Sequence, residues 1–196
     1  MIGILLAAGF SRRFGSADKL LQPLPDGRLI ATAAAEHLIQ AIPTCVAVLR
    51  AENKVLAEML ESRGFKLVFC DESKPEMADS LATAIRFSTG FAEADDGFVI
   101  ALADMPYIQT ATISAVAERL GEGATILIPT YQDQRGHPVG FDAKFRKELE
   151  SLQGDEGARS IIKCHSDEVT LLVCEDAGIL ADIDTPADLS QQLQKP

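Results

Sequence analysis

The chain lacks any apolar run long enough to cross a membrane, which takes about 20 apolar residues in a helix. Its opening run, residues 1–8, is apolar but short, and no basic segment precedes it. A signal peptide carries such a segment, so we do not expect one here. The sequence therefore predicts a cytoplasmic protein with no membrane partner.

Cysteine pairs and histidine clusters are absent as well. The cysteines, Cys45, Cys70, Cys164 and Cys174, form no C-x-x-C pair and have no histidine cluster near them. Zinc and other transition metals favour such ligand sets, so no site of that kind is expected. We expect each cysteine to behave as a small hydrophobic residue in a reducing compartment.

Basic residues are outnumbered, because 18 lysines and arginines stand against 29 aspartates and glutamates, which gives a net charge of −11. Nucleic acids recruit basic surfaces, so a nucleic-acid partner is not expected. The few cations should instead gather where an anionic ligand binds. No repeat, low-complexity tract or linker interrupts the 196 residues, and we expect a single domain over residues 1–196.

The most informative stretch is residues 5–19, which reads LLAAGFSRRFGSADK and follows the apolar residues 1–4. Consecutive apolar residues that end at glycine are typical of a parallel strand buried on both faces. The loop after such a strand lies at the edge where open α/β sheets bind ligands. It contains two glycines and three cations: Gly9, Gly15, Arg12, Arg13 and Lys19. Glycine lets backbone N–H groups approach an anion, so the loop predicts a nucleotide phosphate site.

Two common nucleotide-binding loops do not fit this stretch. A Walker A loop needs lysine and then serine or threonine directly after its second glycine, but Ser16 and Ala17 follow Gly15. The G-x-G-x-x-G spacing of the dinucleotide fingerprint is missing too. The stretch instead resembles the signature loop of the nucleotidyltransferases, L-A-x-G-x-S-x-R-x-G followed by lysine. The matching residues are Leu6, Ala7, Gly9, Ser11, Arg13, Gly15 and Lys19.

This resemblance implies a role for each loop residue. Lys19 and Arg13 would be the catalytic cations. The loop residues that bind the nucleotide would be Leu6, Ala7, Ala8, Gly9, Ser11, Arg12 and Gly15. The plain alternative is a glycine-rich turn whose cations are only solvated.

Strand-like and helix-like patterns alternate along the rest of the chain. Helical periodicity occurs at residues 29–42 and 53–63, and strands are expected at 45–49, 66–70, 98–102, 125–129 and 169–174. Such alternation is typical of a parallel sheet with crossover helices. Together with the resemblance it predicts a three-layer α/β fold with a mostly parallel sheet and helices on both faces. This is the Rossmann-like fold of the nucleotidyltransferases, similar to the nucleotide-diphospho-sugar transferases.

Two aspartates are candidate metal ligands. Asp104 follows the expected strand 98–102, and Pro106 separates it from the next helical pattern, so we expect it at the ligand edge rather than in a helix cap. Its A-D-M-P segment resembles the family's metal motif. The segment D-I-D-T-P-x-D around Asp184 resembles a second one, although Thr185 before proline is also a good helix start. The resemblance implies that Asp104 and Asp184 hold Mg²⁺.

The segment M-A-D-S-L at residues 77–81 resembles the family motif G-M-x-x-S-L, which faces the nucleotide base. This implies that Ser80 contacts the base. Glu76 stands where the family usually has glycine. This departure puts in doubt whether the local backbone conformation and the fit around the base are those of the family. The plain alternative is an ordinary helix start capped by Asp79 or a neighbour.

Two further segments resemble those that line the family's acceptor pocket: R-G-H-P-V at 135–139 and G-D-x-G-A-R at 154–159. The implied acceptor residues are Arg135, His137, Pro138, Asp155 and Arg159. His137 could also be a general base, since the ordinary histidine pKa lies near neutrality. A lone histidine between glycine and proline more often has a conformational role than a role in proton transfer. Because the resembled segment lines the acceptor pocket, we favour acceptor contact. The second segment could also be a helix start capped by Asp155, which is itself an anion site.

Together these motifs resemble the MobA-like NTP transferases, and among them the CTP:molybdopterin cytidylyltransferases. Ala8 gives L-A-A-G where guanylyl relatives have L-A-G-G, and Asp182 and Asp184 stand where those relatives tend to have asparagine. The resemblance implies CMP transfer from CTP to the molybdopterin phosphate, with magnesium. Alternatives are another nucleotide or phosphorylated acceptor, or a pterin-binding maturation factor for a molybdenum hydroxylase, which is also the expected recipient of the product.

Overall fold

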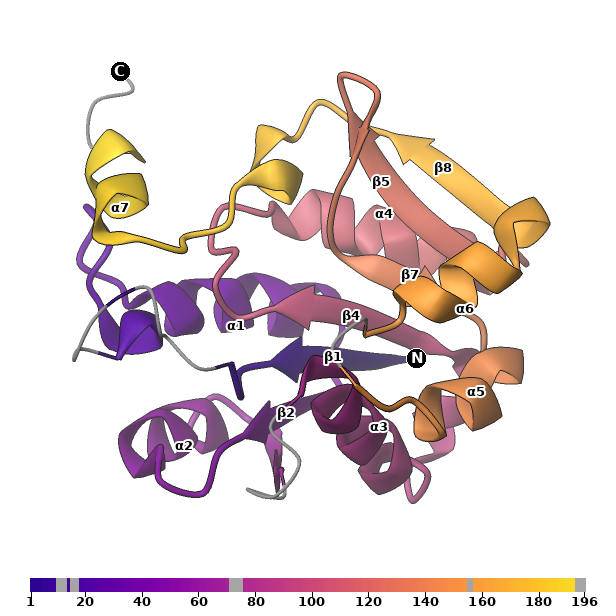
Figure 1. Ribbon diagram of the computed structural model, residues 1–196, viewed down its shortest axis with the longest axis horizontal. Coiled ribbons are helices and arrows are strands. Elements are labelled where there is room, and N and C mark those ends of the chain that lie inside the picture. The colour runs from indigo at the N-terminus through magenta and orange to yellow at the C-terminus, as the bar shows by residue number, and fades with distance from the viewer. Residues whose placement is uncertain (10–13, 15–17, 71–75, 155–156, 193–196) are drawn as a thin grey trace.

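The computed structural model describes residues 1–9, 14, 18–70, 76–154 and 157–192 (Figure 1). Its strands are β1 (Ile2–Leu6), β2 (Cys45–Leu49), β3 (Lys66–Phe69), β4 (Phe98–Leu102), β5 (Ile126–Tyr131), β6 (Gln134–Arg135), β7 (Val139–Phe141) and β8 (Val169–Val173). Its α-helices are α1 (Ile30–Ala41), α2 (Lys54–Glu61), α3 (Met77–Ser88), α4 (Thr110–Gly121), α5 (Arg146–Glu150), α6 (Arg159–Cys164) and α7 (Pro186–Gln192). No helix in these ranges is both long and apolar enough to span a membrane.

All the strands belong to one sheet, in the order β3-β2-β1-β4-β7-β5-β6, with β8 paired to β5. Strands β1 to β4 run parallel, and β8 runs parallel to β5. Strand β7 is antiparallel to both β4 and β5. The expected α/β fold with a mostly parallel sheet is confirmed, and β1 lies inside the parallel part, next to β4.

Helices cover both faces of the sheet (Figure 1). Residues of β1 alternate between two hydrophobic clusters, since Leu5 packs with α1, α2 and α4, whereas Ile4 packs with α3, α5 and α6. Both side chains are fully buried, as expected for a parallel strand covered on both faces. The close approach of α1 requires a glycine in β1, because a Cβ at Gly3 would lie 2.7 Å from Cys45 Sγ and 3.2 Å from the Leu38 side chain.

The hairpin of β5 and β6 was not foreseen from the sequence. Strand β5 continues to Tyr131, and the turn is made by Gln132 and Asp133, whose φ angles are +48° and +61°. Such two-residue hairpin turns favour Asn-Gly or Asp-Gly, so Gln-Asp gives no sequence signal. The hairpin carries Arg135 back toward the sheet, where β7 inserts between β4 and β5.

Candidate functional site

The loops after β1 and β4 leave the sheet at the same point. The two strands are parallel neighbours with Leu6 opposite Leu102, and the backbone N–H of Ala103 donates to the Leu6 carbonyl at 3.1 Å. Ala8 and Gly9 of the glycine-rich loop and Asp104 therefore share the carboxyl edge of the sheet. The edge position expected for Asp104 is confirmed.

Lys19 is held by a short local structure. The Asp18 carboxylate accepts a hydrogen bond from the Leu20 N–H at 3.0 Å and caps the 3₁₀ helix Lys19–Leu21, and Leu20 is buried. The Lys19 ammonium then lies 2.8 Å from a carboxylate oxygen of Asp104 and 3.1 Å from one of Asp184. Burial would lower the pKa of Lys19, but the two facing carboxylates outweigh it and raise that pKa above its ordinary value.

The second aspartate is placed by the backbone around it. The N–H of Ile183 donates to the Asp104 carbonyl at 3.0 Å, so Asp184 follows directly beside Asp104. Asp188 accepts hydrogen bonds from Thr185 Oγ1 and from the N–H groups of Asp184 and Thr185. These bonds lower the pKa of Asp188 and cap the start of α7. The D-I-D-T-P-x-D segment is thus both a helix cap and the element that presents Asp184.

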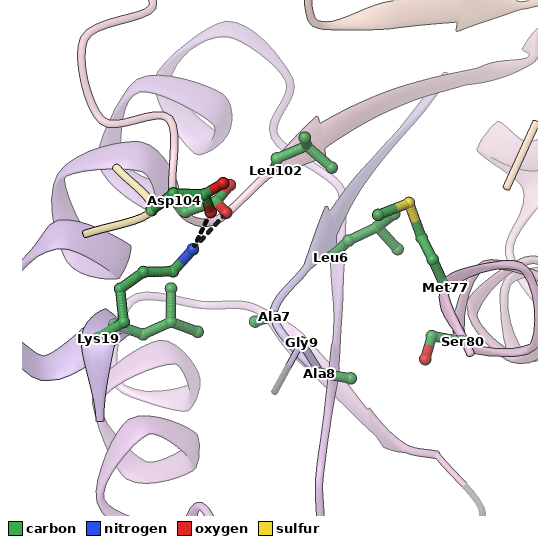
Figure 2. A pocket seen from close by; sticks show the side chains of 11 residues that line it. Leu6, Ala7, Ala8, Gly9, Lys19, Met77, Ser80, Leu102 and Asp104 are labelled. Carbon is green, nitrogen blue, oxygen red and sulfur yellow. Dashed lines mark hydrogen bonds and ion pairs between the residues drawn. The ribbon is translucent and has the colours of Figure 1, made fainter. Parts of the chain in front are cut away.

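A cavity of about 200 Å³ opens at this edge (Figure 2). Ser80 and Met77 of α3 lie across it from Lys19 and Asp104 (Figure 2). Of the expected residues, those that line it are Leu6, Ala7, Ala8, Gly9, Lys19, Ser80, Asp104 and Asp184. It is also lined by Met77 of the M-A-D-S-L segment, and by Leu20 and Leu102, for which the sequence indicates no role. The expected residues Ser11, Arg12, Arg13 and Gly15 lie outside the described part of the chain.

The α3 side of this cavity is ordinary helix backbone. Glu76 is the N-cap residue, with extended backbone angles that any residue adopts, so its replacement of the family's glycine does not distort the chain here. Of the alternative, a helix start capped by Asp79 or a neighbour, the part that concerns Asp79 is wrong, because Asp79 lies in the first turn; the N-cap position belongs to its neighbour Glu76, without a side-chain cap hydrogen bond. The Ser80 hydroxyl donates to the Glu76 carbonyl at 3.2 Å, and its oxygen is also able to accept hydrogen bonds.

A second cavity, of about 390 Å³, adjoins the first and shares Leu6, Met77 and Leu102 with it. Its walls are mostly apolar, from Ile100, Ile128, Val139, Phe141 and Ile162 among others. Its polar members are Arg135, His137, Arg159 and Lys163. The structure thus brings together the three expected acceptor residues Arg135, His137 and Arg159.

The other acceptor expectations have different outcomes. Pro138 is buried beside the second cavity and does not line it, and Asp155 lies outside the described residues. Lys163 was missed, although it follows Arg159 by four residues on α6. That spacing places both side chains on one face of a helix and is the signal that could have found it.

His137 is fixed against the chain segment that precedes Asp184. The backbone N–H of His137 donates to the Ile179 carbonyl at 3.0 Å. A Cβ at the neighbouring Gly136 would lie 2.3 Å from the same oxygen, so only glycine fits there. Burial lowers the pKa of His137; Asp104 and the Ile100 carbonyl oppose this and Arg159 adds to it. The imidazole is therefore neutral at pH 7.

The donor chemistry of the first cavity suits a hard cation. The Lys19 ammonium contacts both Asp104 and Asp184, so a point between the two carboxylates already accommodates a positive group. Two carboxylate ligands, completed by water and substrate phosphate, are typical of Mg²⁺. Among the described residues there is no group of three or more histidine, cysteine, aspartate or glutamate side chains arranged for a metal. The residues present fit magnesium.

Comparisons with known proteins agree with this geometry. Purine catabolism protein PucB of Bacillus subtilis (strain 168) is 27% identical, over 96% of this chain and 93% of that protein. A molybdenum cofactor guanylyltransferase of Cupriavidus pinatubonensis is 28% identical, over 95% and 93%. Rv0371c from Mycobacterium tuberculosis, in the crystal structure of its complex with manganese, is 25% identical in sequence and has a TM-score of 0.78, over 100% of this chain and 98% of that chain. The model of the MobA-like NTP transferase domain matches residues 3–169, and the chain belongs to that family.

Proposed function

We propose that this protein transfers CMP from CTP to the terminal phosphate of molybdopterin and releases pyrophosphate. The observation that carries the proposal is the Lys19 ammonium between the Asp104 and Asp184 carboxylates, in a cavity that adjoins a second one. Cation and carboxylates at one sheet edge suit nucleotide phosphates, and the second cavity offers room for a second substrate. The relative named as a molybdenum cofactor guanylyltransferase supports a molybdenum-cofactor acceptor.

The proposed reaction needs no general base. The attacking group is an ionised phosphate, which displaces pyrophosphate from the α-phosphorus of CTP without first losing a proton. The described lining of the first cavity holds no histidine or cysteine, and the Ser80 hydroxyl is bonded to a backbone carbonyl. Catalysis then rests on positioning and on charge stabilisation.

Lys19 supplies positive charge where negative charge develops. With nucleotide bound, its ammonium would face the α-phosphoryl and pyrophosphate oxygens, assisted by Arg13 of the same loop. The Asp18 cap and the buried Leu20 keep the base of the Lys19 side chain fixed. The ammonium is thus presented at the end of an otherwise anchored segment.

Asp104 and Asp184 would hold Mg²⁺. When bound, this ion neutralises the substrate phosphates and polarises the phosphorus that is attacked. The related Rv0371c structure was determined as a complex with manganese, which supports a divalent cation as a ligand of this protein. The hydrogen bond from the Ile183 backbone N–H to the Asp104 carbonyl keeps the Asp104 and Asp184 carboxylates together.

Ala8 and Ser80 support cytosine as the base. Ala8 is buried in the lining of the first cavity, and its methyl group occupies space that a glycine would leave open. Ser80 retains acceptor lone pairs, which match the amino group of cytosine. A pyrimidine with an exocyclic amine satisfies both features.

The second cavity suits molybdopterin as the acceptor. Apolar walls such as Ile100 and Phe141 would cover the flat ring system of a pterin. Arg135, Arg159 and Lys163 would attract its phosphate, in a chain whose net charge is −11. A molybdenum hydroxylase is the proposed recipient of the cytosine dinucleotide product.

A pyrophosphate-release assay tests the proposal. The purified protein is incubated with molybdopterin, magnesium and each of CTP, GTP, ATP and UTP in turn. The proposed function requires pyrophosphate with CTP, dependent on both molybdopterin and magnesium. Release with another nucleotide or acceptor would identify a different transferase, and tight molybdopterin binding without release with any nucleotide would favour the maturation factor.

A further inference from the structure

Asp176 is a buried carboxylate that belongs to none of the motifs. Its side chain is 3% exposed, yet it accepts three hydrogen bonds. One oxygen accepts from the Gln109 N–H at 2.8 Å and from the Thr112 hydroxyl at 2.7 Å. The other accepts from the Gly178 N–H at 2.9 Å. Burying a carboxyl group is costly unless its oxygens are hydrogen-bonded, so all three donors hold the side chain in place.

The three bonds join two different parts of the chain. Gln109 and Thr112 belong to the start of α4. Gly178 belongs to the 3₁₀ helix Ala177–Leu180, which opens the segment 176–184. Asp176 therefore pins this segment, which we call the anchor loop, to α4.

The anchor loop touches both cavities. Its Ile179 carbonyl accepts from the His137 N–H at 3.0 Å, and its Ile183 N–H donates to the Asp104 carbonyl at 3.0 Å. Asp184, at its end, lines the first cavity, and His137 lines the second. The loop also lies directly on the chain after Asp104, because a Cβ at Gly178 would come within 2.1 Å of the Tyr107 carbonyl.

We infer that Asp176 is a positioning residue for both cavities, because its three hydrogen bonds fix the anchor loop that sets Asp184 beside Asp104 and holds the backbone of His137. It contacts no substrate and acts through the loop alone. The part of this inference that concerns metal rests on the proposed function, in which the two aspartates hold the cation. The part that concerns the loop does not.

Two variants displace the loop in different ways. In Asp176→Asn an amide replaces the carboxylate, and whichever way it turns, its NH₂ group faces the N–H of Gln109 or of Gly178. In Gly178→Ala the carboxylate is kept, but the new methyl group would lie 2.1 Å from the Tyr107 carbonyl oxygen and 2.9 Å from Asp176 Oδ1, so the loop must move away from the chain after Asp104. Either variant should shift the anchor loop, so the inference stays testable even where one of the two substitutions unfolds the chain.

Matched controls separate positioning from general destabilisation. Gly121→Ala adds the same methyl group in α4, where nothing lies within 4 Å. Ser88→Ala removes a hydrogen bond from an equally buried side chain, whose hydroxyl donates to the Ala84 carbonyl at 2.7 Å in α3. Neither residue lines a cavity.

Two measurements on the folded proteins decide the matter: Mn²⁺ affinity without nucleotide, from electron paramagnetic resonance, and amide hydrogen exchange at Ile183 and His137. Asp176→Asn and Gly178→Ala should weaken Mn²⁺ binding about 10- to 100-fold, as when a group that orients a metal ligand is lost. Both variants should also exchange the Ile183 and His137 amides faster, while the two controls match the wild type in both measurements.

The outcomes are distinguishable. If wild-type protein binds no Mn²⁺, the metal site of the proposed function is wrong, and the amide exchange still tests the anchor loop. If both loop variants bind Mn²⁺ and protect the two amides as the wild type does, the inference about Asp176 is overturned. An effect of the same size in Gly121→Ala and Ser88→Ala would also overturn it, because general loss of stability would then suffice.

Discussion

The Lys19 ammonium lies 2.8 Å from the Asp104 carboxylate, although 85 positions separate the two residues. The same ammonium bonds Asp184, so one cation bridges the two carboxylates. In the proposed reaction the carboxylates would turn to Mg²⁺ and the ammonium to the substrate phosphates. Both exchanges keep opposite charges paired, which limits the cost of the partly buried charges.

The first prediction concerns Asp104 and Asp184. Asparagine at either position keeps the shape and removes the charge, so turnover should fall by about 10²-fold or more, as when a preorganised charge stabiliser is lost. Turnover of CTP with molybdopterin and saturating Mg²⁺ measures the effect. Asp167→Asn, at an exposed position in the 3₁₀ helix Ser166–Glu168, is the matched control. Full activity of either site variant would remove these two aspartates from the metal site.

The second prediction concerns Lys19. Methionine keeps the apolar stem and removes the ammonium, so kcat should fall by more than KM for CTP rises, because the charge acts mainly in the transition state. Steady-state kinetics at saturating molybdopterin separate the two constants. An unchanged kcat with a raised KM would assign Lys19 to ground-state binding of CTP only.

Lys19, Ala8 and Asp104 could be predicted because each occupies a strand end or a loop whose local pattern is informative. The meeting of Lys19 with Asp184 could not, because 165 positions separate them and only the folded chain brings them together. Asp176 gave no signal for a related reason. Its local donor, the Gly178 N–H, forms an ordinary turn, whereas its other two donors, the Gln109 N–H and the Thr112 hydroxyl, lie 67 and 64 positions away in sequence.

The same reasoning explains the uneven result at the second cavity. Arg135 was expected there, but the hairpin that presents it was not, because its turn uses Gln132 and Asp133 without glycine. Lys163 was missed although its spacing from Arg159 was readable in the sequence. Motif resemblance marks the residues that a family shares, whereas a cavity wall is shaped by every side chain that reaches it.

The third prediction concerns pH and His137. Its pKa in the folded protein lies below the ordinary value of 6.5, so the unfolded chain takes up a proton first as the pH falls. The neutral ring therefore favours folding above about pH 6.5, and this stability is lost as the pH falls through the lower folded pKa. Between the unfolded and the folded pKa, the free energy of unfolding should fall by at most about 1.4 kcal/mol per pH unit because of His137.

Urea unfolding of wild type and His137→Phe between pH 7.5 and 5 measures this effect. Phenylalanine keeps a ring and cannot titrate, so the free energy of unfolding of the variant should fall less steeply with acid. His37, whose pKa burial also lowers, is present in both proteins, and the difference between them isolates His137. Parallel curves would show that the His137 ring is not held neutral by its burial.

The fourth prediction concerns Arg159 and Lys163. Both line the second cavity only, so alanine at either should raise KM for molybdopterin and leave CTP binding within about threefold, since separate sites act nearly independently. Arg119→Ala, at an exposed position on α4 where Arg119 pairs with Glu122, is the control. Equal losses of CTP and molybdopterin affinity would place these cations on the nucleotide side and contradict the proposed division of the two cavities.

The last prediction concerns the base and rests on Ala8 and Ser80, which both line the first cavity. A purine must find room against the Ala8 methyl group, and a base that leaves a buried polar group unpaired loses about 1–3 kcal/mol. CTP should therefore be preferred over GTP by about tenfold to a few hundredfold in kcat/KM. Ala8→Gly should narrow this ratio by admitting GTP. Kinetics with both nucleotides on the wild type and the variant test this. A wild type that prefers GTP overturns the choice of CTP. An unchanged ratio of kcat/KM for CTP to that for GTP in the variant removes only the steric argument and leaves the hydrogen bond at Ser80 as the source of the preference.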